Sequence, residues 1–417
     1  MLSTENASTS VHLRARSQQA QEVLYTIVFV VVVAYAGFGD GLNYWHIRTW
    51  LNLQSPLTFV LPLVMSGLLF HWLTTRRLPG LRPILHALLF VGMLLFASVT
   101  GVLVFSAQNV LGLLQLAMFG ALLVLVRAEF AAGGHRLVVL MVRSLVAIHY
   151  FLCTYVVASY LGWHLMGMDL NVHGGAVNEY YGFRPSGFGY EPSWTAFGIA
   201  ATFTGIFYLA AERRLGAFLA MAVAFMLLTS MTGYVFLVIF TLVYAGERRD
   251  AARFVAALLI LAGLAIGGFY VYRDRIATIL SGADASILMR FSSARIAVDI
   301  IAQSFPLGVG YGNFQSFADY ADPTVIYGLQ EGLLGYYKSD MFVLNVIAEL
   351  GVMGVLCVVA LAAIFFSRKW LPPVYFLILI VASGTVLVQA TLVLAAVVGA
   401  LDRERGMLST KAALPTT

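Results

Sequence analysis

Long runs of apolar residues recur along almost the whole sequence, and they constrain the fold more than any other feature. Each run is close to the roughly 20 residues that a helix needs to cross the hydrocarbon core of a bilayer. Only 11% of the 417 residues are charged, against about 25% in a typical soluble domain. The runs are continuous rather than alternating, which excludes a transmembrane β-barrel. The sequence therefore predicts an all-α polytopic membrane protein.

The apolar runs predict about twelve transmembrane helices between residues 23 and 401, with polar tails at 1–22 and 402–417. Two stretches, 215–245 and 371–401, are too long for one span, and each is divided at a cluster of Ser, Thr and Gly residues. The predicted spans are 23–38, 56–74, 83–99, 109–126, 137–161, 193–211, 215–230, 232–245, 254–272, 341–366, 373–385 and 387–401.

Basic residues decide the expected orientation of these helices. Five short loops together hold twelve Arg and Lys residues against four acidic ones, whereas acidic residues outnumber basic ones in the long loops 162–192 and 273–340. By the positive-inside rule, the short loops and both termini face the cytoplasm and the two long loops face the other side. The net charge of +5 thus reports topology, and no nucleic-acid partner is expected.

The two long outer loops are where chemistry is expected, because they hold nearly all the charge that does not serve topology. Loop 162–192 leads into GFRPSGFGYEPSWTAFGIA at 182–200, in which proline and glycine flank Arg184 and favour a shaped loop. A rim arginine can simply reach lipid headgroups, and Glu191 can simply cap the next helix. The functional alternatives are an arginine that binds an anion and a carboxylate that acts as a base. His173 is a further candidate base.

The second outer loop carries two arginines and a glycine-rich turn. Arg290 and Arg295 lie in MRFSSARIAVDII at 289–301, whose helical periodicity fits either an interfacial helix with a solvated basic face or a phosphate-binding pair. PLGVGYGNF at 306–314 is not a nucleotide-binding loop, because no strand precedes it and no Lys-Ser/Thr pair follows it. The sequence contains no cluster of ligands with metal spacing, so no cofactor or metal is predicted.

Two polar side chains fall inside the predicted fifth span. Arg143 lies near its cytoplasmic end, from which a long cation reaches the headgroups, and His149 is expected to bond a neighbouring helix. A transporter or flippase would place charges along a route through the bilayer. Here the charged residues are concentrated in the two outer loops, which favours an enzyme that acts at one face of the membrane over a transporter.

Three stretches of the sequence are distinctive when taken together: FRPSGFGYEPSWTAFG at 183–198, Arg290 through PLGVGYGNF at 306–314, and SDMFVLNVIAELGVMGVL at 339–356. In this order they resemble the O-antigen ligase and O-antigen/exopolysaccharide polymerase superfamily of bacterial inner-membrane glycosyltransferases. The turn at 229–233 is similar in placement, although the family often has Arg where Met231 stands. The resemblance implies a GT-C-like fold in the bacterial inner membrane, with the long loops in the periplasm.

The resemblance also implies a reaction. The donor is a glycan on undecaprenyl diphosphate, and glycosyl transfer at the periplasmic face is inverting and needs neither metal nor cofactor. Ligases of the family usually have His where Asp340 stands, so a polymerase of lipid-linked repeats is favoured over a ligase; a flippase or a scaffold of an export complex is the alternative from another class. A chain-length regulator and export proteins are possible partners. The implied diphosphate ligands are Arg184, Arg290 and Arg295, the candidate bases are Glu191, Asp340 and His173, and Tyr190 and Tyr311 are further substrate contacts.

Overall fold

A computed structural model places most of the chain from residue 107 onwards. The described residues are 84–89, 91–92, 107–132, 135–171, 176–178, 182–187, 192–247, isolated positions between 255 and 277, 285–314, 341–367, 369–382 and 388–412. Most of them are helical, which confirms the all-α prediction, and the strands among them form one two-stranded hairpin. The predicted spans 23–38 and 56–74 lie outside the described residues.

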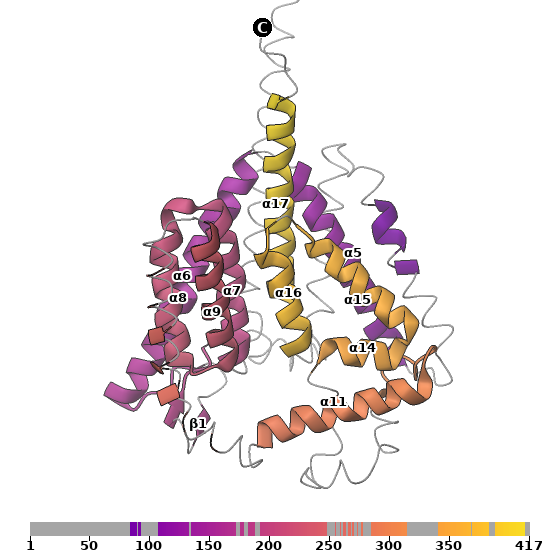
Figure 1. Ribbon diagram of the computed structural model, residues 1–417, viewed down its shortest axis with the longest axis horizontal. Coiled ribbons are helices and arrows are strands. Elements are labelled where there is room, and N and C mark those ends of the chain that lie inside the picture. The colour runs from indigo at the N-terminus through magenta and orange to yellow at the C-terminus, as the bar shows by residue number, and fades with distance from the viewer. Residues whose placement is uncertain are drawn as a thin grey trace, which may run out of the picture.

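Four helices run side by side in one half of the bundle (Figure 1). They are α6 (His135–Met166), α7 (Pro192–Leu209), α8 (Arg214–Leu228) and α9 (Met231–Glu247), with the short turn η1 (Ala211–Arg213) between α7 and α8. The segment Leu137–Met166 of α6 is the one described helix that is long and apolar enough to cross a membrane by length and composition. The count of twelve spans remains a prediction.

The other half contains the remaining helices, with α17 packed between the two halves against both α5 and α7 (Figure 1). These helices are α5 (Ala107–Ala132), α11 (Ala285–Ser304), α14 (Phe342–Leu350), α15 (Val352–Phe365), α16 (Leu371–Ala382) and α17 (Val388–Ala412). Helix α11 lies across the lower end of the bundle, beneath α14, rather than along the bundle axis (Figure 1).

Helix α7 forms the centre of the core. Residues of α7 from Thr195 to Phe207 are almost all buried, so other helices surround this part of α7 on every side. Its aromatic rings interlock with those of α9 and α16: Phe203 meets Phe240 edge-on at 4.7 Å between ring centroids, and Phe197 meets Tyr375 at 6.0 Å. Such pairs add to the free energy gained from burial of apolar area.

Polar contacts join helices at two further points. His149 of α6 is fully buried and bonds two neighbours: its Nδ1 lies 3.0 Å from Thr202 Oγ1 of α7, and its Nε2 lies 2.9 Å from the Ala217 carbonyl oxygen of α8. This confirms the predicted role of His149. On the other side of the bundle, Arg127 of α5 donates to the Asp402 carboxylate of α17 at 2.7 and 2.9 Å.

Helix boundaries differ from the predictions at several places, and α5, for example, ends at Ala132 rather than at 126. Helix α6 continues to Met166, into predicted loop 162–192, because the residues that follow 161 are still apolar. Helix α17 continues past 401 to Ala412. The predicted single span 341–366 is two helices, because Gly351 has φ 58° and ψ −132°, which are not helical. The predicted division of 215–245 agrees with the break between α8 and α9 at Thr229 and Ser230.

Candidate functional site

Arg184 ends a short hairpin at the lower end of the bundle. Strands β1 (Ala176–Asn178) and β2 (Gly182–Arg184) pair antiparallel, and the register places Ala176 opposite Arg184. The ring of the preceding residue, Phe183, stacks on Trp163 of α6 with centroids 4.5 Å apart and ring planes 5° apart. The last turns of α6 therefore fix the position of β2.

Asn171 holds the residues that follow Arg184. Its side-chain carbonyl accepts hydrogen bonds from the backbone N–H groups of Ser186 and Gly187, both at 2.9 Å, and its side-chain amide donates to Asp169 at 2.8 Å. The Thr195 hydroxyl of α7 donates to the Ser186 carbonyl. Because Asn171, Ser186 and Thr195 are buried, breaking a hydrogen bond among them would leave a costly unsatisfied polar group. The backbone beside Arg184 is therefore held from two elements.

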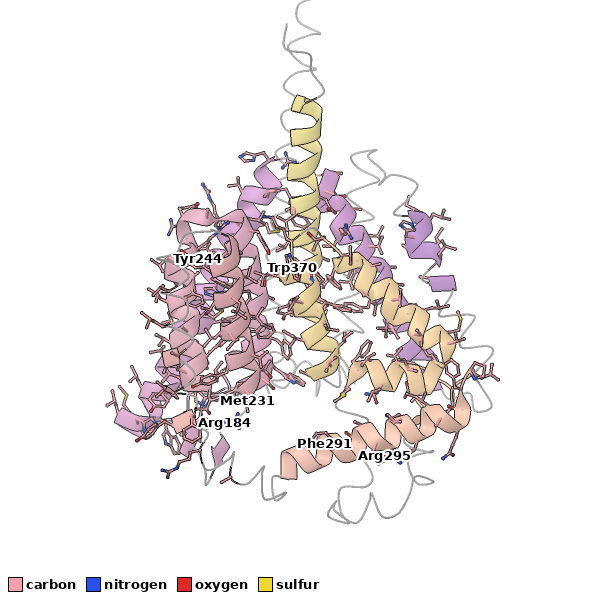
Figure 2. All side chains as sticks on the ribbon, in the orientation of Figure 1. Arg184, Met231, Tyr244, Phe291, Arg295 and Trp370 are labelled. Atoms are coloured by element: carbon pink, nitrogen blue, oxygen red, sulfur yellow. The ribbon has the colours of Figure 1, made fainter. Side chains whose placement is uncertain are left out.

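The Arg184 side chain reaches the turn between α8 and α9. Its Nε lies 3.1 Å from Thr229 Oγ1, and its Nη2 donates to the Thr229 carbonyl at 3.3 Å. Thr229 has φ 46° and ψ 36°, the left-handed conformation that a β-branched residue rarely adopts. Met231 lies beside this pair at the start of α9 (Figure 2). Two of the segments that the sequence singled out, 183–198 and 229–233, are therefore in contact.

The other two singled-out segments also form one unit, which we call the loop–helix clamp (residues 306–310 with 348–352). Backbone atoms of the glycine turn bond the junction of α14 and α15. Three hydrogen bonds make the clamp: Val309 N–H to the Ala348 carbonyl at 3.0 Å, Gly310 N–H to the Glu349 carbonyl at 2.8 Å, and Val352 N–H to the Pro306 carbonyl at 2.8 Å. Since the amides of Val309 and Gly310 donate inside the protein, these two groups are not available to a phosphate.

Two glycines allow the clamp to close. A Cβ on Gly351 would lie 2.0 Å from the Pro306 carbonyl oxygen, and one on Gly308 would lie 2.5 Å from the Gly351 nitrogen. Both residues also have positive φ, 58° and 76°. Only glycine fits such close contact of two backbones in this conformation.

Buried polar side chains gather behind the clamp. Glu349 and Asn345 are four residues apart on α14, and both are buried, as is Asn313 of the glycine turn. Burial raises the pKa of the nearby Tyr311 hydroxyl, and the Glu349 carboxylate and Cys357 raise it further. The phenol of Tyr311 therefore stays protonated under physiological conditions.

Helix α11 places Arg295 at the same end of the bundle as Arg184, but the two side chains lie apart (Figure 2). Arg295 is exposed and forms an ion pair with Asp299 at 3.2 Å, one helical turn away. The opposite face of α11 packs Ile296 and Ile300 into a cluster with Ala348 of α14. The helical conformation expected for this segment is confirmed, and phosphate binding by its arginines stays a prediction. The backbone of Arg290 belongs to α11, and its side chain lies outside the described residues.

Comparison with known protein families gives a match over the part of the chain that contains the α8–α9 turn, α11 and the clamp. Residues 216–359 match the family model described as O-Antigen ligase. This match supports a relationship of the segment 216–359 to the O-antigen ligase and polymerase superfamily. Among curated proteins and among solved structures, nothing gives a significant match. Proteins of the matched family are integral membrane proteins that act on lipid-linked glycans.

Several residues that the superfamily resemblance implied as site residues lie outside the described residues: His173, Tyr190, Glu191 and Asp340. Among the described residues, no group of three or more His, Cys, Asp or Glu side chains is placed to hold a metal ion.

Sequence reasoning did not select Asn171, Thr229 or Glu349 as site residues. The signal for Glu349 was present, because an acidic residue four positions from Asn345 in an apolar segment predicts a buried polar face. The other two become visible only through contacts with residues 15 to 45 positions away.

Proposed function

We propose that this protein is a polymerase that joins glycan repeats carried on undecaprenyl diphosphate at the periplasmic face of the bacterial inner membrane. The observation that carries the proposal is the firmly held position of Arg184, whose neighbours are fixed by Asn171 and Thr195 and whose guanidinium is oriented by Thr229. A guanidinium held in one direction is suited to the planar, bidentate recognition of phosphate oxygens.

The chemistry of the proposed reaction explains these residue types. A hydroxyl of the acceptor glycan attacks the anomeric carbon of the donor from the face opposite the leaving group, so the configuration inverts. The bond from that carbon to the phosphate oxygen breaks, and the diphosphate leaves with the electron pair. Arg184 stabilises the charge that develops on the diphosphate, with Arg290 and Arg295 as further proposed contacts. Neither a metal nor a cofactor takes part in this proposal.

The acceptor hydroxyl must also lose its proton. A carboxylate or imidazole within hydrogen-bond reach is the usual acceptor. Glu191 is the first proposed base because it directly precedes α7, next to the segment that holds Arg184. Asp340 and His173 follow it in preference, and Tyr190 and Tyr311 are proposed glycan contacts.

A ligase that moves finished lipid-linked glycan to another acceptor is the second candidate. The matched family model, described as O-Antigen ligase, is compatible with a ligase but does not distinguish it from a polymerase. Against it stands Asp340, at the position where the ligases that the sequence resembles usually have His.

The deciding experiment is the profile of lipid-linked glycans in cells that lack this protein, resolved by size and by membrane face. A polymerase predicts single repeats that accumulate on the periplasmic face, and a ligase predicts long lipid-linked chains. Single repeats on the cytoplasmic face would identify a flippase and overturn the proposal.

The role of Arg184 is tested in the same cells. Arg184→Ala should lower the polymer yield per protein by at least about a hundredfold, because an oriented donor at a developing charge commonly contributes that much. Arg184→Lys keeps the positive charge but loses the planar guanidinium that can make two parallel hydrogen bonds, so it should recover only part of the polymer yield. Polymer at wild-type yield from Arg184→Ala, at matched protein levels in the membrane, would remove Arg184 from the site.

A further inference from the structure

A cavity of about 610 Å³ opens at the end of the bundle opposite Arg184. It lies between the first turns of α6, the turn from α7 into η1, and α17. Three arginines from these three places line it: Arg143, Arg213 and Arg403. Glu212 is the one carboxylate among the lining residues, so the cavity wall carries a net positive charge.

The arginines of this cavity differ from other cations at the same end. Arg127 is paired with Asp402, and the Arg214 guanidinium lies 4.7 Å from the centroid of the Phe207 ring. Among the residues that the structure describes, the side chains of the three cavity arginines make no hydrogen bond or ion pair. Like charges converging on one cavity repel one another unless an anion lies between them.

Apart from His135, the rest of the wall is apolar. Val138, Val142 and Val146 succeed one another at four-residue spacing on α6, so they form one stripe along that helix. This stripe belongs to the segment Leu137–Met166, which is long and apolar enough to cross a bilayer. A cationic cavity that continues into an apolar stripe on a membrane helix suits an amphiphile better than a small soluble anion.

We propose that this cavity binds the headgroup of an anionic phospholipid from the leaflet at this end of the bundle. The phosphate lies among Arg143, Arg213 and Arg403, and one acyl chain follows the valine stripe of α6. Glu212 disfavours a second phosphate and suits the hydroxyl of a glycerol headgroup. The bound lipid joins α6 to α17, which share this cavity. The site is separate from glycan transfer and does not depend on the proposed function.

The test compares lipids on the purified full-length protein. Phosphatidylglycerol and phosphatidylcholine with identical chains are titrated into detergent solution, and bound lipid is counted by native mass spectrometry alongside the thermal unfolding temperature. Phosphatidylglycerol should bind and raise the unfolding temperature, whereas phosphatidylcholine should not. Inorganic phosphate and glycerol phosphate at equal concentration form a separate arm, which distinguishes a free anion from a lipid.

Charge-removing variants locate the site. Arg213→Gln and Arg403→Gln should each weaken phosphatidylglycerol binding about fivefold, the usual contribution of one basic residue near an anionic membrane surface. Lys369→Gln, at the same end but outside the cavity lining, is the matched control and should bind as wild type does. If a glutamine variant is unstable in phosphatidylcholine, Arg403→Lys replaces it and should keep most of the binding.

Two results would overturn the proposal. One is equal phosphatidylglycerol binding by wild type and the Arg213→Gln/Arg403→Gln double variant. The other is a thermal shift reproduced in full by inorganic phosphate or glycerol phosphate, which would assign the cavity to a soluble anion.

Discussion

Among single residues, Thr229 has the most informative conformation in the proposed site. A left-handed backbone costs an L-residue roughly 1–2 kcal/mol, and Asn or Gly would adopt it more readily. Thr229 instead supplies two oxygen atoms to the Arg184 guanidinium, one from its hydroxyl and one from its carbonyl. Strained residues of this kind often lie at functional sites. We infer that the hydroxyl is kept at this position because it orients Arg184.

This inference predicts different results from two replacements of Thr229. Thr229→Val preserves the shape but removes the oxygen that accepts from Arg184 Nε, so polymer yield should fall about tenfold, the loss expected for one hydrogen bond to a charged group. Thr229→Ser keeps that oxygen and should retain nearly full yield. Polymer formed per unit of membrane protein is the measurement. Equal polymer yields from the two variants would show that the Thr229 hydroxyl does not contribute to the function of Arg184.

Among the elements, the loop–helix clamp connects the large outer loop to α14 and α15. Its three hydrogen bonds come from backbone atoms, and its close approach depends on Gly308 and Gly351. Helix α11 directly precedes the clamp in the chain and packs on α14. The position of Arg295 on α11 is therefore tied to the clamp.

Adding a single methyl group at Gly351 should prevent the loop–helix clamp from forming as described. Gly351→Ala introduces a Cβ that would lie 2.0 Å from the Pro306 oxygen, at a positive φ. We expect it to destabilise the protein by about 3 kcal/mol or more. Gly263→Ala is the control, because a Cβ there meets nothing within 4 Å. The thermal unfolding temperature in detergent measures both, and an unchanged temperature for Gly351→Ala would contradict the described clamp.

The helices of this fold were largely predictable, because apolar runs and helical periodicity are local properties of the sequence. The break at Gly351 was missed since the residues around it are as apolar as a continuous span, and its cause is a backbone contact with Pro306, 45 positions earlier. Arg184 lies at the end of β2, next to the proline and glycine that predicted a shaped segment, and its role in the site stays a prediction. Its partner Thr229 was not selected from the sequence, because a contact across 45 residues depends on how α7, α8 and α9 pack.

For the whole molecule, the two ends of the bundle carry different chemistry. One end holds Arg184, the clamp and α11, and the other holds the basic cavity and the Arg127–Asp402 pair. If the sidedness predicted from basic residues is right, these ends lie on opposite faces of the membrane. The donor glycan and the proposed lipid ligand then belong to different leaflets.

Thiol labelling tests this orientation. The native cysteines, Cys153 and Cys357, are buried and should react little. We expect a membrane-impermeant maleimide to label Arg295→Cys from the periplasmic side of intact spheroplasts, and Lys369→Cys only in inverted vesicles. Both native residues are exposed. Labelling of both variants from the same side would refute the predicted topology.

The backbone nature of the clamp has a consequence for how such a protein can diversify. Although Gly308 and Gly351 must stay glycine, main-chain hydrogen bonds do not depend on the side chain at position 307, and Leu307 inside the clamp is exposed. Substitution at such a position alters the surface beside α11 while the connection to α14 and α15 persists. A lineage that comes to act on a different glycan can therefore change such exposed loop residues one at a time while the protein stays folded.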